Sequence, residues 1–349
     1  MAKAKKAKKQ GLTSREKRFE VLAALEKERR SRVITYITGD RQGLATRISS
    51  DVFPMIHQHL VRMGHQPRID MFLYSPGGLT ISGYALVNLI REFCDEFNVI
   101  VPFKAHSTAT LICLGANEIL MTKMGQLSPI DPSVQHPLGP TFNPAGQPQI
   151  LPVNVEDVTA FFNLAKSGAS LDKEESKLKA FEILAGKVHP IVLGAVHRSR
   201  EQIAFLATQL MAYHTKDPAK VKRTVDTLTR ERFSHDYIIS PREAKELLGL
   251  KITEPNGEVS KLVVDLFNAY NSFLELDQPY SQETVLGAEE TVQATFDRAV
   301  IESAGLTHIF RSVKVVSRIQ VPQGPHSPLP VTGYQERTLR EQWVMDSNR

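Results

Sequence analysis

The order of apolar and polar positions in the first third of the chain predicts strands that alternate with helices. Near-continuous apolar and β-branched runs predict strands buried on both faces, over residues 32–38, 68–74, 98–105 and 118–121. Apolar residues spaced three or four apart predict helices over residues 51–64, 79–93 and 107–116. Strand, helix and strand at this spacing are typical of βαβ units, so we predict an α/β fold with a parallel sheet.

Beyond these elements the pattern predicts one long loop and several helices. Residues 135–152 contain five prolines and two glycines without any periodicity, which indicates a loop. Helical spacing returns after it, over residues 154–166, 172–186, 190–213 and 240–249. We divide the chain into a basic N-terminal arm that is helical or partly disordered (1–31), a central domain (32–319) and a C-terminal extension (320–349).

The net charge of +5 is concentrated in the arm. Residues 1–30 contain 11 Lys and Arg against 4 Glu, a local balance of +7 that leaves −2 for the rest of the chain. No aromatic residues interleave the lysines and no nucleic-acid motif follows them, so we expect a solvated tail and not a nucleic-acid partner.

The composition also bears on membrane association, on the redox compartment and on metal binding. No stretch approaches the ~18 apolar residues of a membrane span, and we expect neither a signal peptide nor a membrane anchor. Cys94 and Cys113 both lie in apolar segments, which favours a reducing, cytoplasmic setting and a packing role for both thiols. The motifs H-E-x-x-H and C-x-x-C do not occur, and the histidines of "HQH" (57–59) are expected to be solvated or half-buried, so we expect no metal and no cofactor.

Two turns at the ends of predicted strands carry residues that could support chemistry. The segment Ser75-Pro76-Gly77-Gly78 follows the second strand, and Ser107 follows the third. Because the carboxyl ends of parallel strands meet at one edge of a sheet, both turns should lie together. Each has a structural alternative: the glycines could serve the turn alone, and Ser107 could be the N-cap of the helix after it.

Four motifs in order resemble the Clp-fold serine peptidases. They are "SPGG", a serine about 30 residues later in "STATLICLGANEILM", then "LSPIDPS", and finally "RFSHDYIISPREAKELLGLKI" (232–252). The sequence is most similar to the serine dehydrogenase proteinase (SDH) family, relatives of signal peptide peptidase and of the Clp protease subunit. This resemblance implies a Clp/crotonase-like fold of stacked ββα units. It also implies a cytoplasmic, ATP-independent serine peptidase that works through an acyl-enzyme and assembles as a homo-oligomer, with the helix at 154–166 as a candidate contact.

The resemblance also implies roles for individual residues. Ser107 falls on the nucleophile, and the backbone N–H groups of Gly78 and Thr108 fall on the oxyanion hole. This agrees with the chemistry, because acyl transfer needs an exposed hydroxyl and N–H donors aimed at the oxygen that becomes negative. Thr108 stands where Ala, Gly or Met is usual in the family, which narrows the pocket but keeps the N–H.

The sequence offers several candidates for the general base. Asp131 falls where the Clp protease has its catalytic His, and Asp236 falls on its catalytic Asp, with His235 beside it. Our hypothesis is that His235 activates Ser107 while Asp131 or Asp236 orients the imidazole, since neighbouring residues of a strand face opposite ways and His235 and Asp236 would not both face the serine. Signal peptide peptidases use a downstream lysine instead, which makes Lys166 the alternative base, although a lysine near a helix C-terminus is commonly a surface residue.

Two other functions remain as rivals of a peptidase acting on peptide or protein substrates. A crotonase-type acyl-CoA enzyme would use the same two N–H groups to hold a thioester oxygen and would not need Ser107. A catalytically inactive oligomeric scaffold would need neither Ser107 nor these N–H groups.

Overall fold

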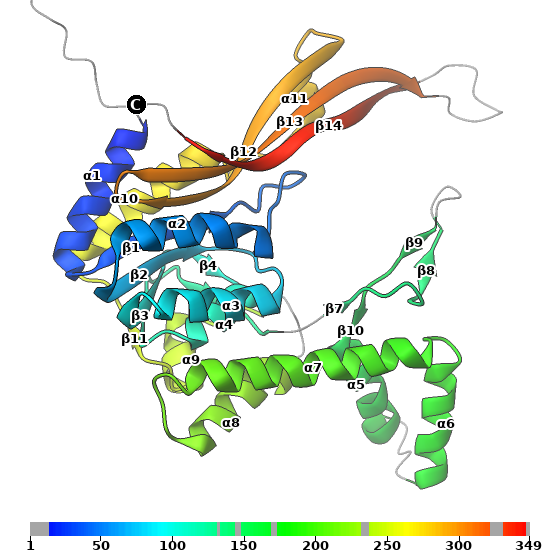
Figure 1. Ribbon diagram of the computed structural model, residues 1–349. Helices are drawn as coiled ribbons and strands as arrows, with labels where there is room; N and C mark the ends of the chain where they lie inside the picture. The colour runs from blue at the N-terminus through cyan, green and yellow to red at the C-terminus, as the bar shows by residue number, and fades with distance from the viewer. Residues whose placement is uncertain are drawn as a thin grey trace, which may run out of the picture.

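The centre of the molecule is a mixed β-sheet of eight strands (Figure 1). It is seen in a computed structural model that describes residues 14–130, 133–143, 148–168, 173–231, 237–321 and 331–346. Five neighbouring strands run parallel, in the order β11 (Ile252–Thr253), β5 (Glu118–Met121), β3 (Cys94–Val101), β2 (Gln66–Tyr74) and β1 (Arg32–Thr38). Three antiparallel strands continue the sheet, in the order β12 (Thr291–Ser303), β13 (Leu306–Val321) and β14 (Val331–Met345). The predicted α/β class is confirmed, and these five strands are parallel, as predicted for the sheet, whereas the three antiparallel strands were not predicted.

Side chains of the parallel strands alternate between two apolar cores, one on each face of the sheet. On one face, Ile34 and Met71 belong to a core shared with the helices α2 (Phe53–Met63), α3 (Thr80–Arg91) and α4 (Thr108–Leu114). On the other, Val33 and Phe72 belong to a core shared with α1 (Ser14–Arg29) and α10 (Gly257–Leu274). Neighbouring residues of one strand are therefore buried on opposite faces, which is why these strands are continuously apolar.

The remaining elements surround the sheet or extend from it. The helices are a 3₁₀ turn at Ser50–Val52, α5 (Val155–Asn163) with a π-helical turn at Leu164–Gly168, α6 (Glu174–Ala185), α7 (Pro190–Met211), α8 (Pro218–Asp226) with a π-helical turn at Thr227–Glu231, α9 (Pro241–Glu246) and α11 (Gln282–Leu286). Short strands pair in twos, β4 (Lys104–Ala105) with β6 (Gln126–Leu127), β7 (Ser133–Val134) with β10 (Val153–Asn154), and β8 (Thr141–Phe142) with β9 (Gln149–Ile150). The predicted loop thus contains two-residue strands, which are too short to produce a periodic pattern.

The two ends of the chain pack onto the sheet. The helix α1, predicted as part of an arm, places Leu22 and Leu25 in the core that it shares with α10. At the other end, β13 runs through residue 320 and β14 pairs along it, from Val321 opposite Val331 to His308 opposite Met345. Figure 1 shows these long strands projecting beyond the body of the molecule. The division of the chain into three parts stays a prediction.

Both cysteines are buried free thiols. Burial raises the pKa of Cys94 to about 11 and raises that of Cys113 as well, so neither thiol is activated as a nucleophile.

A buried histidine pair joins α2 to the antiparallel strands. His59 accepts or donates through both ring nitrogens, with Nδ1 at 2.6 Å from Ser303 Oγ and Nε2 at 3.0 Å from His308 Nδ1. His57 of the same motif is exposed, but His59 is fully buried, so the expectation of a solvated or half-buried pair is wrong for His59. The spacing of two residues along α2 turns the two rings to different sides of the helix.

This pair makes the free energy of unfolding depend on pH. Burial, with smaller contributions from His308 and Arg62, lowers the pKa of His59 to about 3. The unfolded chain therefore binds a proton near pH 6.5 that the folded chain does not, and stability should fall as the pH falls from about 6.5 toward about 3, by up to ~1.4 kcal/mol per pH unit. Urea denaturation at pH 7, 6 and 5 measures this slope, which should be shallower in His59→Gln. The exposed His57→Gln is the matched control and should keep it; equal slopes in both variants would contradict the assignment.

Candidate active site

A second, smaller layer of four short segments leads into the two predicted turns, at Gly77-Gly78 and at Ser107. Ser75, directly after β2, bridges in parallel to Ala105 of β4, which pairs in parallel with Leu127 of β6. Leu127 in turn bridges antiparallel to Ile239. The fourth segment runs in the opposite direction. Tyr237 and Ile238, which precede Ile239, therefore lie at the same edge of the layer as the described residues that follow the first three segments.

At this edge the two predicted turns are in contact. Gly77 has φ +110°, and a Cβ added to it would lie 2.8 Å from Ser107 Cβ, so only glycine permits this approach. A Cβ on Gly78 would lie 2.1 Å from the carbonyl oxygen of Ile48. The prediction that both turns share one edge is therefore correct. Both glycines are therefore required by the backbone conformation of the turn, and this conformation places Gly77 in contact with Ser107.

The backbone of Ser107 is in a strained conformation. Its φ of +52° and ψ of −114° lie outside the regions that L-residues normally occupy, and its side chain makes no capping hydrogen bond to α4. An N-cap residue usually has an extended backbone, so the structure does not support the capping alternative. Ser107 is half-buried, and a serine on a sharp strand-to-helix turn is instead typical of a nucleophile.

Two buried hydroxyl groups support this turn. The N–H of Ser107 donates to Ser128 Oγ at 2.7 Å, and the N–H of Ser128 donates to Thr110 Oγ1 at 3.0 Å. The Thr110 hydroxyl donates to the carbonyl of Ala105 at 2.8 Å, which closes a loop of contacts around the turn. Sequence reasoning missed Ser128 and Thr110, although both are polar residues inside motifs already singled out.

The backbone N–H groups of Gly78 and Thr108 are both available. The carbonyl of Gly77 accepts from the N–H of Ile48 at 2.8 Å, and in a trans peptide the N–H of Gly78 then points the opposite way. The carbonyl of Ser107 accepts from Leu111 at 3.0 Å, so the N–H of Thr108 points out of the helix. Among the described residues, no hydrogen bond uses either N–H. This arrangement can donate two hydrogen bonds to an oxyanion.

Three of the candidate base and carboxylate residues, Asp131, His235 and Asp236, lie outside the described residues. Of their described neighbours, Ile239 belongs to the layer, and Ile130 follows Leu127 of β6 by three residues. Ile130 donates its N–H to the carbonyl of Leu228 at 2.9 Å, and Ile239 exchanges two backbone hydrogen bonds with Leu127, at 2.9 and 3.0 Å.

Lys166 lies elsewhere in the fold. It is exposed on the π-helical turn after α5 and lines a cavity of about 480 Å³ together with Phe162, Glu174 and Phe181. Neither Ser107 nor Gly78 lines this cavity.

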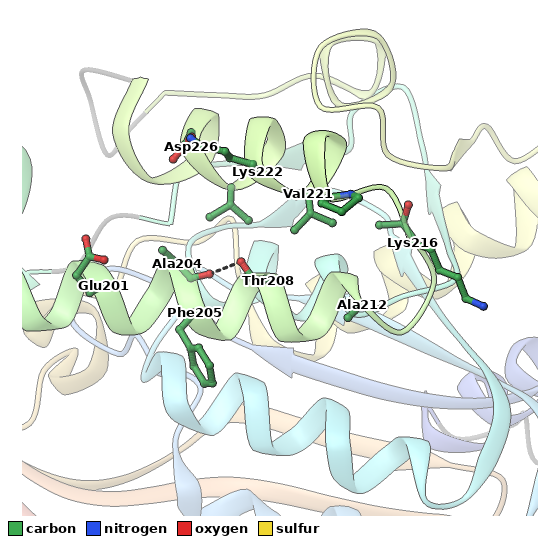
Figure 2. A pocket seen from close by; sticks show the side chains of 12 residues that line it. Glu201, Ala204, Phe205, Thr208, Ala212, Lys216, Val221, Lys222 and Asp226 are labelled. Atoms are coloured by element: carbon green, nitrogen blue, oxygen red, sulfur yellow. Dashed lines mark hydrogen bonds and ion pairs between the residues drawn. The ribbon is translucent and has the colours of Figure 1, made fainter.

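A larger cavity, of about 580 Å³, lies between α7 and α8 (Figure 2). Its wall is mainly apolar, with Ala204 on α7 facing α8, Phe205 on α7 pointing away from α8, and Lys222 of α8 paired to Asp226. Of the candidate site residues that the structure describes, Gly78, Ser107, Thr108 and Lys166 do not line it. In the part of the chain that the structure describes, no three or more His, Cys, Asp or Glu side chains gather as a metal site would require.

Comparison with known proteins matches the N-terminal part of the chain to one family. Residues 4–143 match the model of the ClpP-like SDH-type serine proteinases. The chain is also similar to two proteins of Methanocaldococcus jannaschii that are named as uncharacterized. MJ0137 is 28% identical over 239 residues, which cover 66% of this chain and 71% of the relative. MJ1495 is 29% identical over 130 residues, which cover 35% of this chain and 44% of the relative.

The family match confirms the resemblance inferred from the motifs. The matched residues include Gly78, Ser107 and Thr108, and they end before Lys166 and His235.

Within the described ranges, no helix is both long and apolar enough to cross a bilayer.

Proposed function

We propose that this chain is a serine peptidase that hydrolyses peptide bonds through an acyl-enzyme on Ser107. The observation that carries the proposal is the strained turn of Ser107, which is in contact with Gly77 and makes no capping hydrogen bond. It lies next to two N–H groups that have no acceptor among the described residues. Strain of this kind costs about 1–3 kcal/mol and is found mainly at functional sites. The match to a serine proteinase family over the same residues supports the proposal.

In the proposed reaction, the oxygen of Ser107 attacks the carbonyl carbon of the peptide while His235 takes its proton. The carbonyl electrons move onto the oxygen, which receives hydrogen bonds from the N–H groups of Gly78 and Thr108, each worth about 3–4 kcal/mol at a site of this type. The C–N bond then breaks, and the amine leaves with the proton from His235. Water hydrolyses the ester by the same two steps, which releases the acid and restores Ser107.

His235 is the proposed base, with Asp131 or Asp236 to orient its ring. The support is topological: Asp131 comes four residues after Leu127 of β6, and Ile239, three residues after Asp236, pairs with Leu127. Lys166 remains the alternative base, although it lines a different cavity.

We further propose the Clp/crotonase-like fold and a homo-oligomeric, cytoplasmic, ATP-independent enzyme without a cofactor. Two stretches support the stacked ββα units, because β3, β4 and α4 follow one another as long strand, short strand and helix, and β5 is likewise followed by the short strand β6. Large apolar side chains are exposed on α6 and on the turn after α5, which supports a subunit contact there. They are Leu164, Leu178, Phe181 and Ile183.

Reaction with a fluorophosphonate probe tests the proposed function. We expect the serine oxygen to displace fluoride, so that the intact mass increases by one adduct and peptide mapping places it on Ser107. The His235→Ala variant should lose this reaction and Lys166→Ala should keep it; the opposite result would move the base to Lys166.

The rivals predict other outcomes. A wild-type protein that is unlabelled at every pH from 6 to 10 and cleaves no peptide would favour the inactive scaffold. Turnover of an acyl-CoA thioester that survives Ser107→Ala would favour a crotonase-type enzyme.

A further inference from the structure

The side chain of Thr108 lies between the two halves of the proposed oxyanion hole. It is fully buried, and its hydroxyl donates to the carbonyl oxygen of Gly78 at 2.6 Å. Its methyl group packs against α3 so closely that a Cβ added to Gly83 would lie 2.5 Å from Thr108 Cγ2. Both branches of this side chain are therefore engaged, one with the glycine turn and one with the helix that follows it.

This contact restrains the position of Gly78. Glycine has no side chain to restrict its own backbone, so the contacts of its neighbouring peptide groups must do so. The carbonyl before Gly78 accepts from Ile48 at 2.8 Å, and the carbonyl of Gly78 itself accepts from Thr108. The residue that supplies one N–H of the proposed hole thus holds the residue that supplies the other.

We infer that the hydroxyl of Thr108 is a positioning group that sets the distance between the N–H of Gly78 and its own N–H. This role rests on the proposed function, since it matters for catalysis only if the two N–H groups receive an oxyanion. It is carried by a side chain, whereas the role expected for residue 108 from the sequence uses its backbone alone. Hydrogen-bond donors act on a transition state only when they are held at the correct separation before it forms.

Two substitutions separate the hydroxyl from the shape of the side chain. Thr108→Val keeps the branch but replaces the oxygen by a methyl group, which needs about 3.3–3.6 Å from a carbonyl oxygen. Because the present contact is 2.6 Å, the carbonyl of Gly78 must move away. We expect the rate of fluorophosphonate labelling of Ser107 to fall by about 10²-fold, the loss typical of a displaced or missing oxyanion donor. Thr108→Ser keeps the donor and should retain most of the wild-type rate.

A buried threonine elsewhere provides the matched control. Thr224 on α8 is 1% exposed and its hydroxyl donates to the carbonyl of Leu248 at 2.8 Å. Thr224→Val removes the same kind of hydrogen bond and should lower the melting temperature without changing the labelling rate.

The pH profile of Thr108→Val is a further test. Its labelling rate should fall equally at every pH, and the midpoint of the pH–rate profile should stay the same, because the base is not altered.

Three results would overturn the inference: Thr108→Val labels as fast as wild type, Thr108→Ser labels as slowly as Thr108→Val, or Thr224→Val loses as much rate as Thr108→Val. If wild type is not labelled at all, the proposed function fails on its own account. Crystal structures of wild type and Thr108→Val then decide the positioning role, because an unchanged distance between the nitrogens of Gly78 and Thr108 contradicts it and an increased distance supports it.

Discussion

A Ser107→Ala variant is expected to lose peptide cleavage by at least about 10⁴-fold, and to lose fluorophosphonate labelling entirely. The substitution removes the only oxygen that forms the proposed ester, while the N–H groups of Gly78 and Thr108 remain and could still assist a direct attack by water. The fold should be unaffected, because the Ser107 hydroxyl makes no hydrogen bond among the described residues. Mass spectrometry and a peptidase assay measure the loss. A variant that still accepts one adduct would show that another residue is the nucleophile.

Ser107→Gly provides a control that also tests the strain. Glycine occupies a positive φ without the steric penalty of a Cβ, so the backbone at φ +52° should relax. This variant should be as inactive as Ser107→Ala and more stable than it by about 1 kcal/mol, the lower end of the range for a strained residue. Equal stability in urea denaturation would mean that the turn stores no strain.

Replacing Arg18 by methionine is expected to lower the free energy of unfolding by about 3–5 kcal/mol. Arg18 of α1 is 1% exposed and binds Glu302 of β12 through two hydrogen bonds, at 2.8 and 3.0 Å. Glu302 is fully buried and also accepts from the hydroxyls of Tyr270 and Thr307. Removing the guanidinium leaves a buried carboxylate without its counter-charge, and urea denaturation at pH 7 measures the cost.

Two further variants distinguish this mechanism from a simple loss of packing. In Arg18→Met with Glu302→Met, both charges are gone, and much of the lost stability should return. Arg68→Met breaks the same kind of Arg–Glu pair at a partly exposed site, with Glu96, and should cost less than ~1 kcal/mol. If the double variant is no more stable than Arg18→Met, the buried charge is not the cause of the loss.

The parallel part of the fold could be predicted well because its strands are buried on both faces. The predicted bounds of β1 and β5 agree with the structure, and β2 differs from its prediction by two residues at one end. By contrast, the predicted strand at 98–105 is divided into β3 and β4, which belong to different layers. Only Pro102 and Phe103 separate the two strands, and β4 is a two-residue strand, Lys104–Ala105, which is too short to show a period of its own.

The antiparallel strands were not anticipated, although β12 does alternate over part of its length. Val292 and Phe296 face one way and Gln293 and Thr295 the other, but few of these side chains are fully buried, so the contrast along the strand is weak. The burial of Arg18 could not be anticipated either. A charged residue in an arginine- and lysine-rich segment appears solvated until its partner is known, and Glu302 lies 284 residues away.

The order of the strands and turns could be predicted from the sequence, and so could the meeting of the Gly77-Gly78 turn with Ser107 at one edge. The sequence motifs also identified the family that residues 4–143 match. Only the tertiary structure decided that Ser107 is strained and not a cap, that Ser128 supports its N–H, and that Thr108 holds Gly78. These properties depend on distances between segments 20 to 30 residues apart, which are set by the packing of α3 against α4 and of β4 against β6, and no local pattern encodes a distance of that kind.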